Sequence, residues 1–512
     1  MKLTVFFVIL LLFLYPLLTP GLPITHDGEA LVARIAAYTQ AFADGHFPPR
    51  WAGNLNYGYG APVFIFFYPL LGYLGAALHW VGLSYIDAYK ALAALAFVGS
   101  GLSFFLWLAQ RGKPTAAFIG ALFYALSPYH FLNLYVRGDI GELMALAIAP
   151  LVLWSIDRRA IIGGSVAYAL LILSHHGVAF LLTPVFVGYA ILQKRTVLSF
   201  ILGLGLSAYF WLPALVERHF TASDRLFGAS YRDHFLSLAR LVWSPWGFGD
   251  RVNAPGGLAP QIGLVHGFVL ILAIAICWKI RPVRGELLFW LGIIIVSTFF
   301  LLPQSAAVWD RVLLLRSMGF PWRFIGVAHV AVAAVIGLAM QHRSMKQLTV
   351  VVMLLLLLSS YPLSKISGSV IKPEGYWTAY PGSTSYHGET TTIWTAGDPG
   401  WYAKERVSTI EGKATVSAVE RKTQRHVFRI DAQTAAKILD NTTYFPGWQV
   451  TVNGKKTPIE FQDPAHRGLI TFAVPAGTSF VEVTFGESPI RLIADIITVA
   501  SAAAILLLWI VA

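Results

Sequence analysis

The chain has 512 residues, of which 56% are hydrophobic and only 12% charged. Soluble domains carry about a quarter charged residues, so this composition excludes an ordinary soluble protein and indicates an integral membrane protein. The formal net charge of +12 does not predict a nucleic-acid partner, because many Lys and Arg residues fall in short loops between apolar runs, where positive charge orients membrane proteins.

Apolar runs near the ~20 residues that cross a bilayer as a helix predict a polytopic α-helical membrane protein with about twelve spanning helices. No small-residue cleavage site follows the first run, so we interpret it as an uncleaved span. We expect a multi-pass protein of the plasma membrane with both termini in the cytoplasm. The runs are 3–22, 86–109, 115–133, 142–157, 160–174, 177–192, 197–213, 260–278, 287–303, 321–340, 347–363 and 490–511.

One more apolar run, 62–81, decides the topology. If this run crosses the membrane, the basic turn Arg111-Gly112-Lys113 moves to the outside. If it does not cross, this turn and the other basic loops are cytoplasmic, as is usual for positive charge. We therefore predict an interfacial or re-entrant helix here, which leaves 23–85 as one long outer loop. The basic residues that this choice places inside are Arg111, Lys113, Arg158, Arg159, Lys194, Arg195, Lys279, Arg281, Arg284, Arg343 and Lys346.

Residues 28–43 of this loop predict an amphipathic helix that lies on the membrane surface, because Leu31, Ile35, Tyr38 and Phe42 recur at a spacing of three or four. With the outer loops near 133–142, 174–177 and 214–259, this loop is expected to roof a cavity.

The composition changes after the membrane domain of residues 1–364. Residues 365–487 are rich in Thr, Gly and charged residues, and alternation around Val450 and Val483, with an Asn453-Gly454 turn, predicts strands and a hairpin. We expect a small extracytoplasmic β-sandwich domain, followed by a final transmembrane helix in 488–512.

Acidic residues of the outer loops are the first candidates for chemistry. Asp27, Asp139 and Glu142 are all expected on the outer face, where a carboxylate can accept a proton from an attacking hydroxyl. Asp27 alternatively caps the helix that follows it. Asp139 and Glu142 alternatively serve an ion pair with Arg137 or a helix cap.

Histidines and arginines of the same face are candidates for ligand binding. His175 and His176, with Asp139, can hold a divalent metal such as Mg²⁺ or Mn²⁺, although adjacent histidines without a third ligand at fixed spacing are a weak metal signal. Otherwise they are polar residues at a wet helix turn. His26 either orients Asp27 or remains solvated. Arg323 can bind a phosphate group or instead extend to lipid headgroups. Weaker candidates of the same kind are Arg137, Arg311 and Arg316. The positive-charge rule for cytoplasmic loops does not explain the arginines of the fourth outer loop, which are Arg218, Arg225, Arg232, Arg240 and Arg251.

Several short segments resemble known membrane families. An acid in a long first outer loop, followed by another in the second, resembles the GT-C superfamily of polytopic glycosyltransferases. Other segments resemble the membrane family labelled 6-pyruvoyl-tetrahydropterin synthase-related and the end of YfhO-like proteins. They are His26-Asp27, Phe47-Pro48-Pro49-Arg50-Trp51, Gly58-Tyr59-Gly60-Ala61-Pro62, Tyr68-Pro69-Leu70, Arg137-Gly138-Asp139 with Glu142, Phe320-Pro321-Trp322-Arg323-Phe324 and Tyr444-Phe445-Pro446-Gly447-Trp448.

This resemblance implies an inverting transfer from a polyprenyl-phosphate-linked sugar to an extracytoplasmic acceptor, which is a glycan, a lipid or a protein. It implies Asp27 as general base and Asp139 as the second-loop acid, with Glu142 beside it. The single acid of Arg137-Gly138-Asp139 departs from the paired acids of metal-dependent members. The candidate substrate-binding residues are His26, Arg50, Tyr59, Arg137, His175, His176 and Arg323.

Two other functions fit the same residues. A transporter or flippase for lipid-linked glycans would bind the headgroup without forming a bond. A non-catalytic assembly protein of the cell envelope would use the β domain for binding, for which Trp394, Trp401 and Trp448 are candidates. A capping Asp27 that no cavity reaches would favour the assembly protein.

Overall fold

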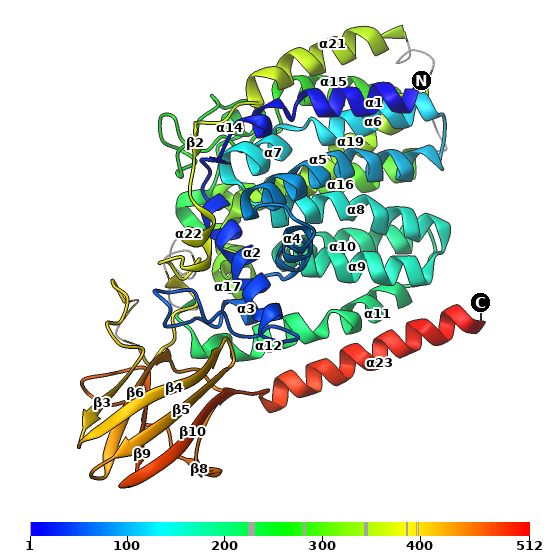
Figure 1. Cartoon of the computed structure of the whole chain (residues 1–512). Coiled ribbons are helices and arrows are strands. Elements are labelled where there is room, and N and C mark those ends of the chain that lie inside the picture. The colour runs from blue at the N-terminus through cyan, green and yellow to red at the C-terminus, as the bar shows by residue number, and fades with distance from the viewer. Residues whose placement is uncertain are drawn as a thin grey trace.

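The computed structural model describes residues 2–223, 231–279, 283–342, 347–385, 388–395, 397 and 399–511. A bundle of helices makes up most of the molecule, and a β region lies beside one end of it (Figure 1). Both chain termini lie at the other end of the bundle. Of the charged loop residues considered above, Arg225, Arg281, Arg343 and Lys346 lie outside the described residues.

Five described helices are long and apolar enough to cross a membrane, or seven if each of two bent pairs counts as one span. The chain is therefore a polytopic membrane protein, and the count of about twelve spans stays a prediction. The five are α5 (Tyr85–Ala109), α8 (Ile140–Arg158), α16 (Arg284–Leu301), α19 (Phe324–Ala339, preceded by the turn η7, Pro321–Arg323) and α23 (Pro489–Val511).

The other predicted runs form bent or shorter helices. One bent pair is α6 (Pro114–Ala125) with α7 (Pro128–Phe131) and η2 (Leu132–Arg137), and the other is α11 (Leu198–Leu206) with α12 (Ala208–Glu217) and η3 (Arg218–Phe220); the bends are 44° and 71°. The shorter helices are α1 (Lys2–Leu12), α9 (Ile161–Ser174), α10 (His176–Leu192), α15 (Leu264–Cys277) and α21 (Thr349–Ser360).

Pro128 explains the first bend. Ser127, directly before it, has extended backbone angles, as expected for a residue whose helical conformation clashes with the following proline ring. The run 115–133 is therefore not one straight helix.

The first outer loop contains three helices, and none is a long span. The predicted surface helix is α2 (Gly28–Ala43), with the expected bounds. The run 62–81 is broken into α3 (Val63–Phe66) and α4 (Leu70–Trp80). The 11 residues of α4 reach only about 16 Å at 1.5 Å per residue, roughly half of a bilayer core. Non-crossing is thus compatible with the observed lengths.

Helix α2 packs inside the protein rather than presenting its apolar face to lipid. Its Leu31, Ile35 and Tyr38 are buried, and α2 contacts α4, α5 and α22 (Glu374–Thr378). Gly72 and Gly75 of α4 allow this approach, because a Cβ at either position would clash with Tyr38 or Ile35. The expected contact with the bilayer surface is replaced by these protein contacts.

The chain after α21 returns to the first outer loop. Strand β2 (Ser369–Val370) pairs antiparallel with β1 (Leu22–Pro23). The strands of the larger sheets begin only at Val407, so in the described part of 371–406 the chain forms α22 and turns instead of the expected strands. This irregular segment supplies part of the cavity wall described below.

The β region contains two antiparallel sheets that share a core. The five-stranded sheet has the order β4-β5-β10-β7-β8 and the three-stranded sheet the order β3-β6-β9. Buried residues of both sheets, such as Ile430, Val483, Ile438 and Phe472, belong to one cluster. The strands are β3 (Val407–Glu411), β4 (Ala414–Lys422), β5 (Arg425–Ala432), β6 (Ala436–Thr443), β7 (Trp448–Val452), β8 (Lys455–Thr457), β9 (Leu469–Val474) and β10 (Gly477–Phe485).

Candidate active site

Two outer loops meet through their backbones at the candidate site. The amide of His26 donates to the carbonyl of Val136 at 3.1 Å, and the amide of Asp27 donates to the carbonyl of Arg137 at 2.7 Å. Gly138 has φ of +70° and lies against Thr25, where a Cβ would clash with the threonine hydroxyl. Since only glycine adopts this conformation at little cost, Gly138 allows the two loops to touch.

The carboxylate of Asp27 is not used to cap the helix that it precedes. Asp27 is at the N-cap position of α2 but makes no cap hydrogen bond; instead, the amide of Gly28 donates to the hydroxyl of Thr25 at 3.1 Å. This carboxylate makes no hydrogen bond or ion pair with the other described residues. Asp27 lines a large cavity. Burial, together with the charge of Asp139, raises the pKa of Asp27, while Arg137 opposes the shift.

Asp139 has both of the structural roles that the sequence suggested. Its carboxylate accepts a hydrogen bond from the amide of Glu142 at 3.0 Å, which caps α8, and it pairs with Arg137 at 2.9 Å. The hydroxyl of Tyr68 donates to it at 2.8 Å. Burial acts to raise the pKa of Asp139, but Arg137 and His175 outweigh it and hold this pKa well below its usual range. Asp139 is therefore an ionised, fully engaged carboxylate.

Glu142 lies behind the cavity wall and not on it. It is fully buried and accepts hydrogen bonds from the hydroxyl of Tyr129 and from Arg137, the latter at 2.6 Å. Arg323 Nε lies 3.5 Å from the same carboxylate. Glu142 is absent from the residues that line the cavity, so its predicted direct catalytic role gives way to one of holding the two arginines.

The two arginines of the site are held by protein contacts. Arg137 bridges Asp139 and Glu142, and its guanidinium stacks over Trp322 at 4.5 Å. Arg323 donates from Nη1 to the carbonyl of Met318 at 2.9 Å, and its Nε has no hydrogen-bond partner among the described residues. Both line the cavity.

The cavity has a volume of about 1490 Å³. This exceeds the ~300–1,000 Å³ of typical small-molecule pockets, so the space suits two substrates or one long substrate. Charged groups share its wall with apolar side chains. Apolar residues on the wall include Phe66, Phe67, Ile172, Phe180, Leu204, Trp211, Leu215, Leu258 and Leu314, and the predicted residues His26, Asp27, Arg137, Asp139, His175, His176 and Arg323 all line it, as does Arg218.

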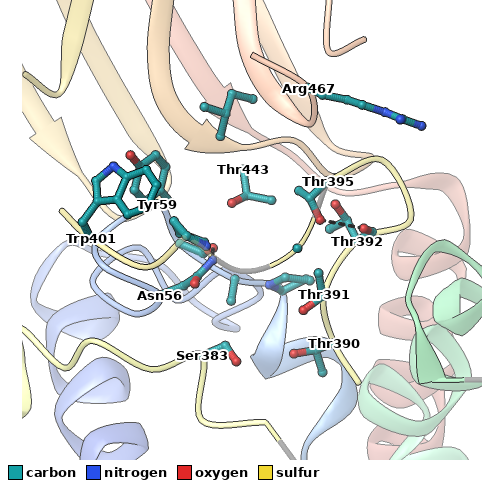
Figure 2. Close-up of a pocket in the computed structure, with 16 residues that line it drawn as sticks. Asn56, Tyr59, Ser383, Thr390, Thr391, Thr392, Thr395, Trp401, Thr443 and Arg467 are labelled. Carbon is teal, nitrogen blue, oxygen red and sulfur yellow. Dashed lines mark hydrogen bonds between the residues drawn. The ribbon is translucent and has the colours of Figure 1, made fainter. Parts of the chain in front are cut away.

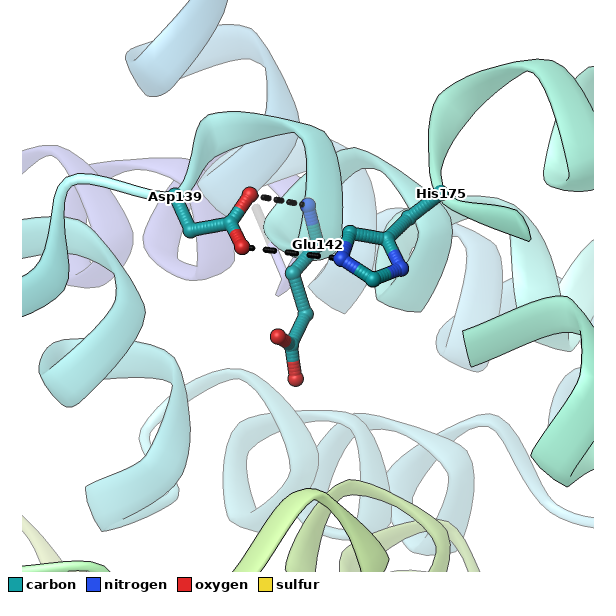
Figure 3. Close-up of side chains that lie close together, drawn as sticks. All are labelled: Asp139, Glu142 and His175. Carbon is teal, nitrogen blue, oxygen red and sulfur yellow. Dashed lines mark hydrogen bonds and ion pairs between the residues drawn. The ribbon is translucent and has the colours of Figure 1, made fainter. Parts of the chain in front are cut away.

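Asp139, Glu142 and His175 lie close enough together to be tested as a metal site (Figure 3). One ligand atom of each lies within 4.8 Å of the others. However, His175 Nδ1 accepts a hydrogen bond from the amide of Val178 at 3.1 Å, so in the neutral ring the proton is assigned to Nε2. That nitrogen faces Asp139 at 3.6 Å and offers no lone pair.

Arg137 also argues against a metal between these acids. It already donates to both carboxylates, and a divalent ion bound to the same oxygens would replace a guanidinium that fits them. The donor set therefore does not fit Mg²⁺ or Mn²⁺ in this arrangement.

Two predicted substrate-binding residues lie elsewhere. Arg50 is buried, with hydrogen bonds to Glu487 at 3.2 Å and Asp495 at 2.7 Å, and it joins the first outer loop to the last helix. It does not line the cavity, so we assign it a structural role. Tyr59 lines a second, smaller pocket.

The other outer arginines and the aromatic candidates have mostly structural contacts. Arg232 pairs with Asp310 at the surface, and Arg240 donates to the carbonyl of Val252 at 2.7 Å. Trp448 is buried against Trp51, so it is not free to bind a glycan.

Sequence reasoning missed Arg34 and Tyr68, which both line the cavity. Arg34 follows Asp27 by seven residues, two helical turns, which places both on one face of α2. Tyr68 lies at the break between α3 and α4, and nothing in the sequence predicts that its hydroxyl reaches Asp139.

No protein-family model matches the chain, and no curated protein matches it. The solved structures that match include the arabinofuranosyltransferase AftD from mycobacteria, determined by single-particle cryo-EM, with 17% sequence identity and a TM-score of 0.42. The match covers 71% of this chain and 26% of that one, so the chain spans about a quarter of the length of this neighbour. A likeness of this size carries no argument about activity, which must be argued from the geometry.

Proposed function

We propose that the protein is a glycosyltransferase of the GT-C type that moves a sugar from a polyprenyl-phosphate donor to an extracytoplasmic acceptor. The observation that carries this proposal is the carboxylate of Asp27. It faces a large cavity without a hydrogen bond or ion pair among the described residues, and its pKa is raised. An acid without a structural partner in a cavity, with a shifted pKa, is typical of a functional group.

In the proposed reaction, Asp27 accepts the proton of an acceptor hydroxyl while that oxygen forms a bond to the anomeric carbon of the donor sugar. The bond from this carbon to the phosphate oxygen breaks, and its electron pair leaves with the phosphate. Attack opposite to the leaving group inverts the configuration. A raised pKa makes the Asp27 carboxylate a stronger base than an ordinary aspartate.

Arg137 and Arg323 are the proposed binders of the donor phosphate. Guanidinium groups fit phosphate oxygens bidentately, and fixed positive charge stabilises the negative charge that develops on a leaving group. Asp139 and Glu142 would act as positioning residues, because both hold Arg137 in place. The apolar part of the cavity wall suits the polyprenyl chain, and the reaction as proposed has no step that uses a metal.

Transfer of labelled sugar from polyprenyl-phosphate donors, by the purified protein and its Asp27→Asn variant, tests the base assignment. Removal of a general base is expected to lower the rate by about 10²–10⁴-fold, while donor binding persists. Undiminished transfer by Asp27→Asn contradicts the assignment.

The same preparation in vesicles separates transfer from transport. Movement of a labelled sugar lipid across the membrane, without transfer to any acceptor, would favour a flippase. Neither transfer nor movement would favour an assembly protein.

A further inference from the structure

A second pocket lies between the first outer loop and the β region, outside the site described above. Its volume is about 160 Å³, which corresponds to about five water molecules by volume. Figure 2 shows Asn56, Tyr59 and Trp401 on one side of it, Thr391, Thr392 and Thr395 on the other, and Thr443 of β6 between them. A space of this size suits a single ring and excludes a folded peptide or a lipid chain.

Three residues that line this pocket each carry a buried polar atom without a hydrogen-bond partner among the described residues. These atoms are Asn56 Oδ1, Thr390 Oγ1 and Thr392 Oγ1, on residues that are 6%, 2% and 3% exposed. A buried polar atom without a partner costs about 1–3 kcal/mol, and nearly all such atoms in proteins are paired. Three such residues around one pocket give it a polar wall whose donors and acceptors are not all taken up by the described protein groups.

The remaining wall specifies the chemistry of a ligand that fits the pocket. Hydroxyls of Ser383, Thr395 and Thr443 add to the polar groups, Tyr59 and Trp401 add aromatic rings, and Arg467 is the single charged residue among the described lining residues. Trp401 is 72% exposed, an unusual position for a large apolar ring without a partner surface. Hydroxyl and amide groups beside aromatic faces match a neutral sugar, which has hydroxyls on its edges and apolar C–H groups on its faces.

Backbone hydrogen bonds hold the three wall segments in place. The amide of Asn56 donates to the carbonyl of Gly382 at 2.8 Å, and the amide of Thr443 donates to the carbonyl of Tyr59 at 2.8 Å. The pocket is thus formed before any ligand arrives, which lowers the entropic cost of binding.

The pocket adjoins the large cavity. Ser383 and Thr390 line both spaces, and Figure 2 shows these two residues together at one edge of the small pocket. The two spaces therefore share part of their wall, so they lie next to each other.

We propose that the small pocket is a carbohydrate subsite that holds one neutral sugar ring of a glycan acceptor, an inference that rests on the proposed transfer at Asp27. The acceptor hydroxyl lies in the large cavity, and a ring further along the same glycan fills the small pocket. Of the acceptor classes considered, this selects a glycan over a protein or a lipid.

Saccharide binding to the purified full-length protein tests this subsite without any donor. Neutral di- and trisaccharides of glucose, galactose, mannose, arabinose and N-acetylglucosamine are each offered, and binding is measured by saturation-transfer NMR. We expect at least one to bind, at least tenfold more weakly to the Thr390→Val/Thr392→Val double variant and at least threefold more weakly to Trp401→Ala. Thr415→Val and Trp243→Ala, exposed positions outside both pockets, are matched controls that should bind as the unchanged protein does.

The outcomes separate the subsite from the proposed reaction. Saccharide binding without sugar transfer would leave the subsite intact and reject the transferase. Failure of all neutral saccharides to bind, or equal binding by the pocket variants with unchanged melting temperatures, overturns the subsite.

Discussion

The amide of Asp27 donates a hydrogen bond of 2.7 Å to the carbonyl oxygen of Arg137. This bond joins the first outer loop to the second, so the candidate base and the candidate phosphate binder are fixed relative to each other by main chain. Arg137 is in turn held by Asp139 and Glu142. A site built on such contacts keeps its geometry without help from the substrate.

The contact between these loops depends on Gly138, and we predict that Gly138→Ala is destabilising. The positive φ and the clash with Thr25 together should cost about 1–3 kcal/mol and separate Asp27 from Arg137, with a loss of transfer activity. Thermal unfolding of the purified protein measures the effect. The control is Gly267→Ala in α15, where a Cβ meets no atom within 4 Å; an equal fall in melting temperature for both variants would contradict the role of Gly138.

The raised pKa of Asp27 predicts a cost to stability that depends on pH. Burial and Asp139 raise this pKa above the ordinary value of 3.8, so the folded state binds the proton more tightly than the unfolded state does. As pH rises from 3.8 through the folded pKa, ionisation therefore destabilises the fold.

Asp27→Asn removes this cost, so the variant should melt at a higher temperature than the unchanged protein at neutral pH. The gain should shrink as pH falls through the folded pKa and vanish below 3.8, where Asp27 is protonated in both states. Differential scanning fluorimetry across this range measures it. A variant that is less stable at neutral pH would show that the carboxylate has a structural partner after all.

The same shift predicts the pH dependence of transfer. If Asp27 must be ionised to act as base, kcat/KM should fall on the acid side with a midpoint above the usual range of an aspartate. Asp139→Asn removes a negative neighbour and should move this midpoint to lower pH. An unchanged midpoint in Asp139→Asn would show that the fall in kcat/KM at acid pH does not report the protonation of Asp27.

Local patterns in the sequence predicted local structure well. The spacing of Leu31, Ile35 and Tyr38 predicted α2 with the observed bounds, and the Asn453-Gly454 turn joins β7 and β8 as expected. The periodicity shows which face of α2 is apolar but not what covers it, so the packing against Gly72 and Gly75 was not predicted. The glycines of α4 indicate a close helix contact only once α2 is known to be the helix that packs there.

Sequence reasoning named several residues that the structure brings to one cavity, and their roles there stay predictions. Asp27, Asp139 and Arg323 line one cavity, and each lies next to the end of a helix. Glu142 and Arg50 are equally polar, but their partners come from distant segments such as Arg323 and Glu487. A sequence alone does not separate a charge that meets substrate from one that is already paired inside the protein.

Arg50 gives a direct test of that distinction. Its two ion pairs connect the first outer loop with Glu487 and Asp495, whose side chains are 34% and 28% exposed. The cost of losing them should therefore fall below the about 3–5 kcal/mol that is typical of a fully buried pair. Arg50→Gln should lower the melting temperature, while the folded fraction keeps its KM for the donor. Arg429→Gln, whose pair with Asp431 is exposed, should change either quantity little. A raised KM with normal stability would return Arg50 to the substrate-binding residues.

The hydrogen bonds of His175 predict that the protein does not depend on a divalent metal at Asp139. His175 Nδ1 accepts a hydrogen bond from the amide of Val178, and Arg137 donates to both acids. Because these groups are already paired, removal of divalent metals with EDTA should leave transfer activity unchanged. A second measurement needs no substrate: Mg²⁺ or Mn²⁺ at millimolar concentration should not raise the melting temperature of the purified protein, whereas an ion bound with micromolar affinity at 1,000 times its Kd would add about 4 kcal/mol. His175→Ala removes the only imidazole of the cluster and serves as the matched variant. A stabilisation by Mn²⁺ that is absent in His175→Ala would show that the cluster rearranges to bind a metal.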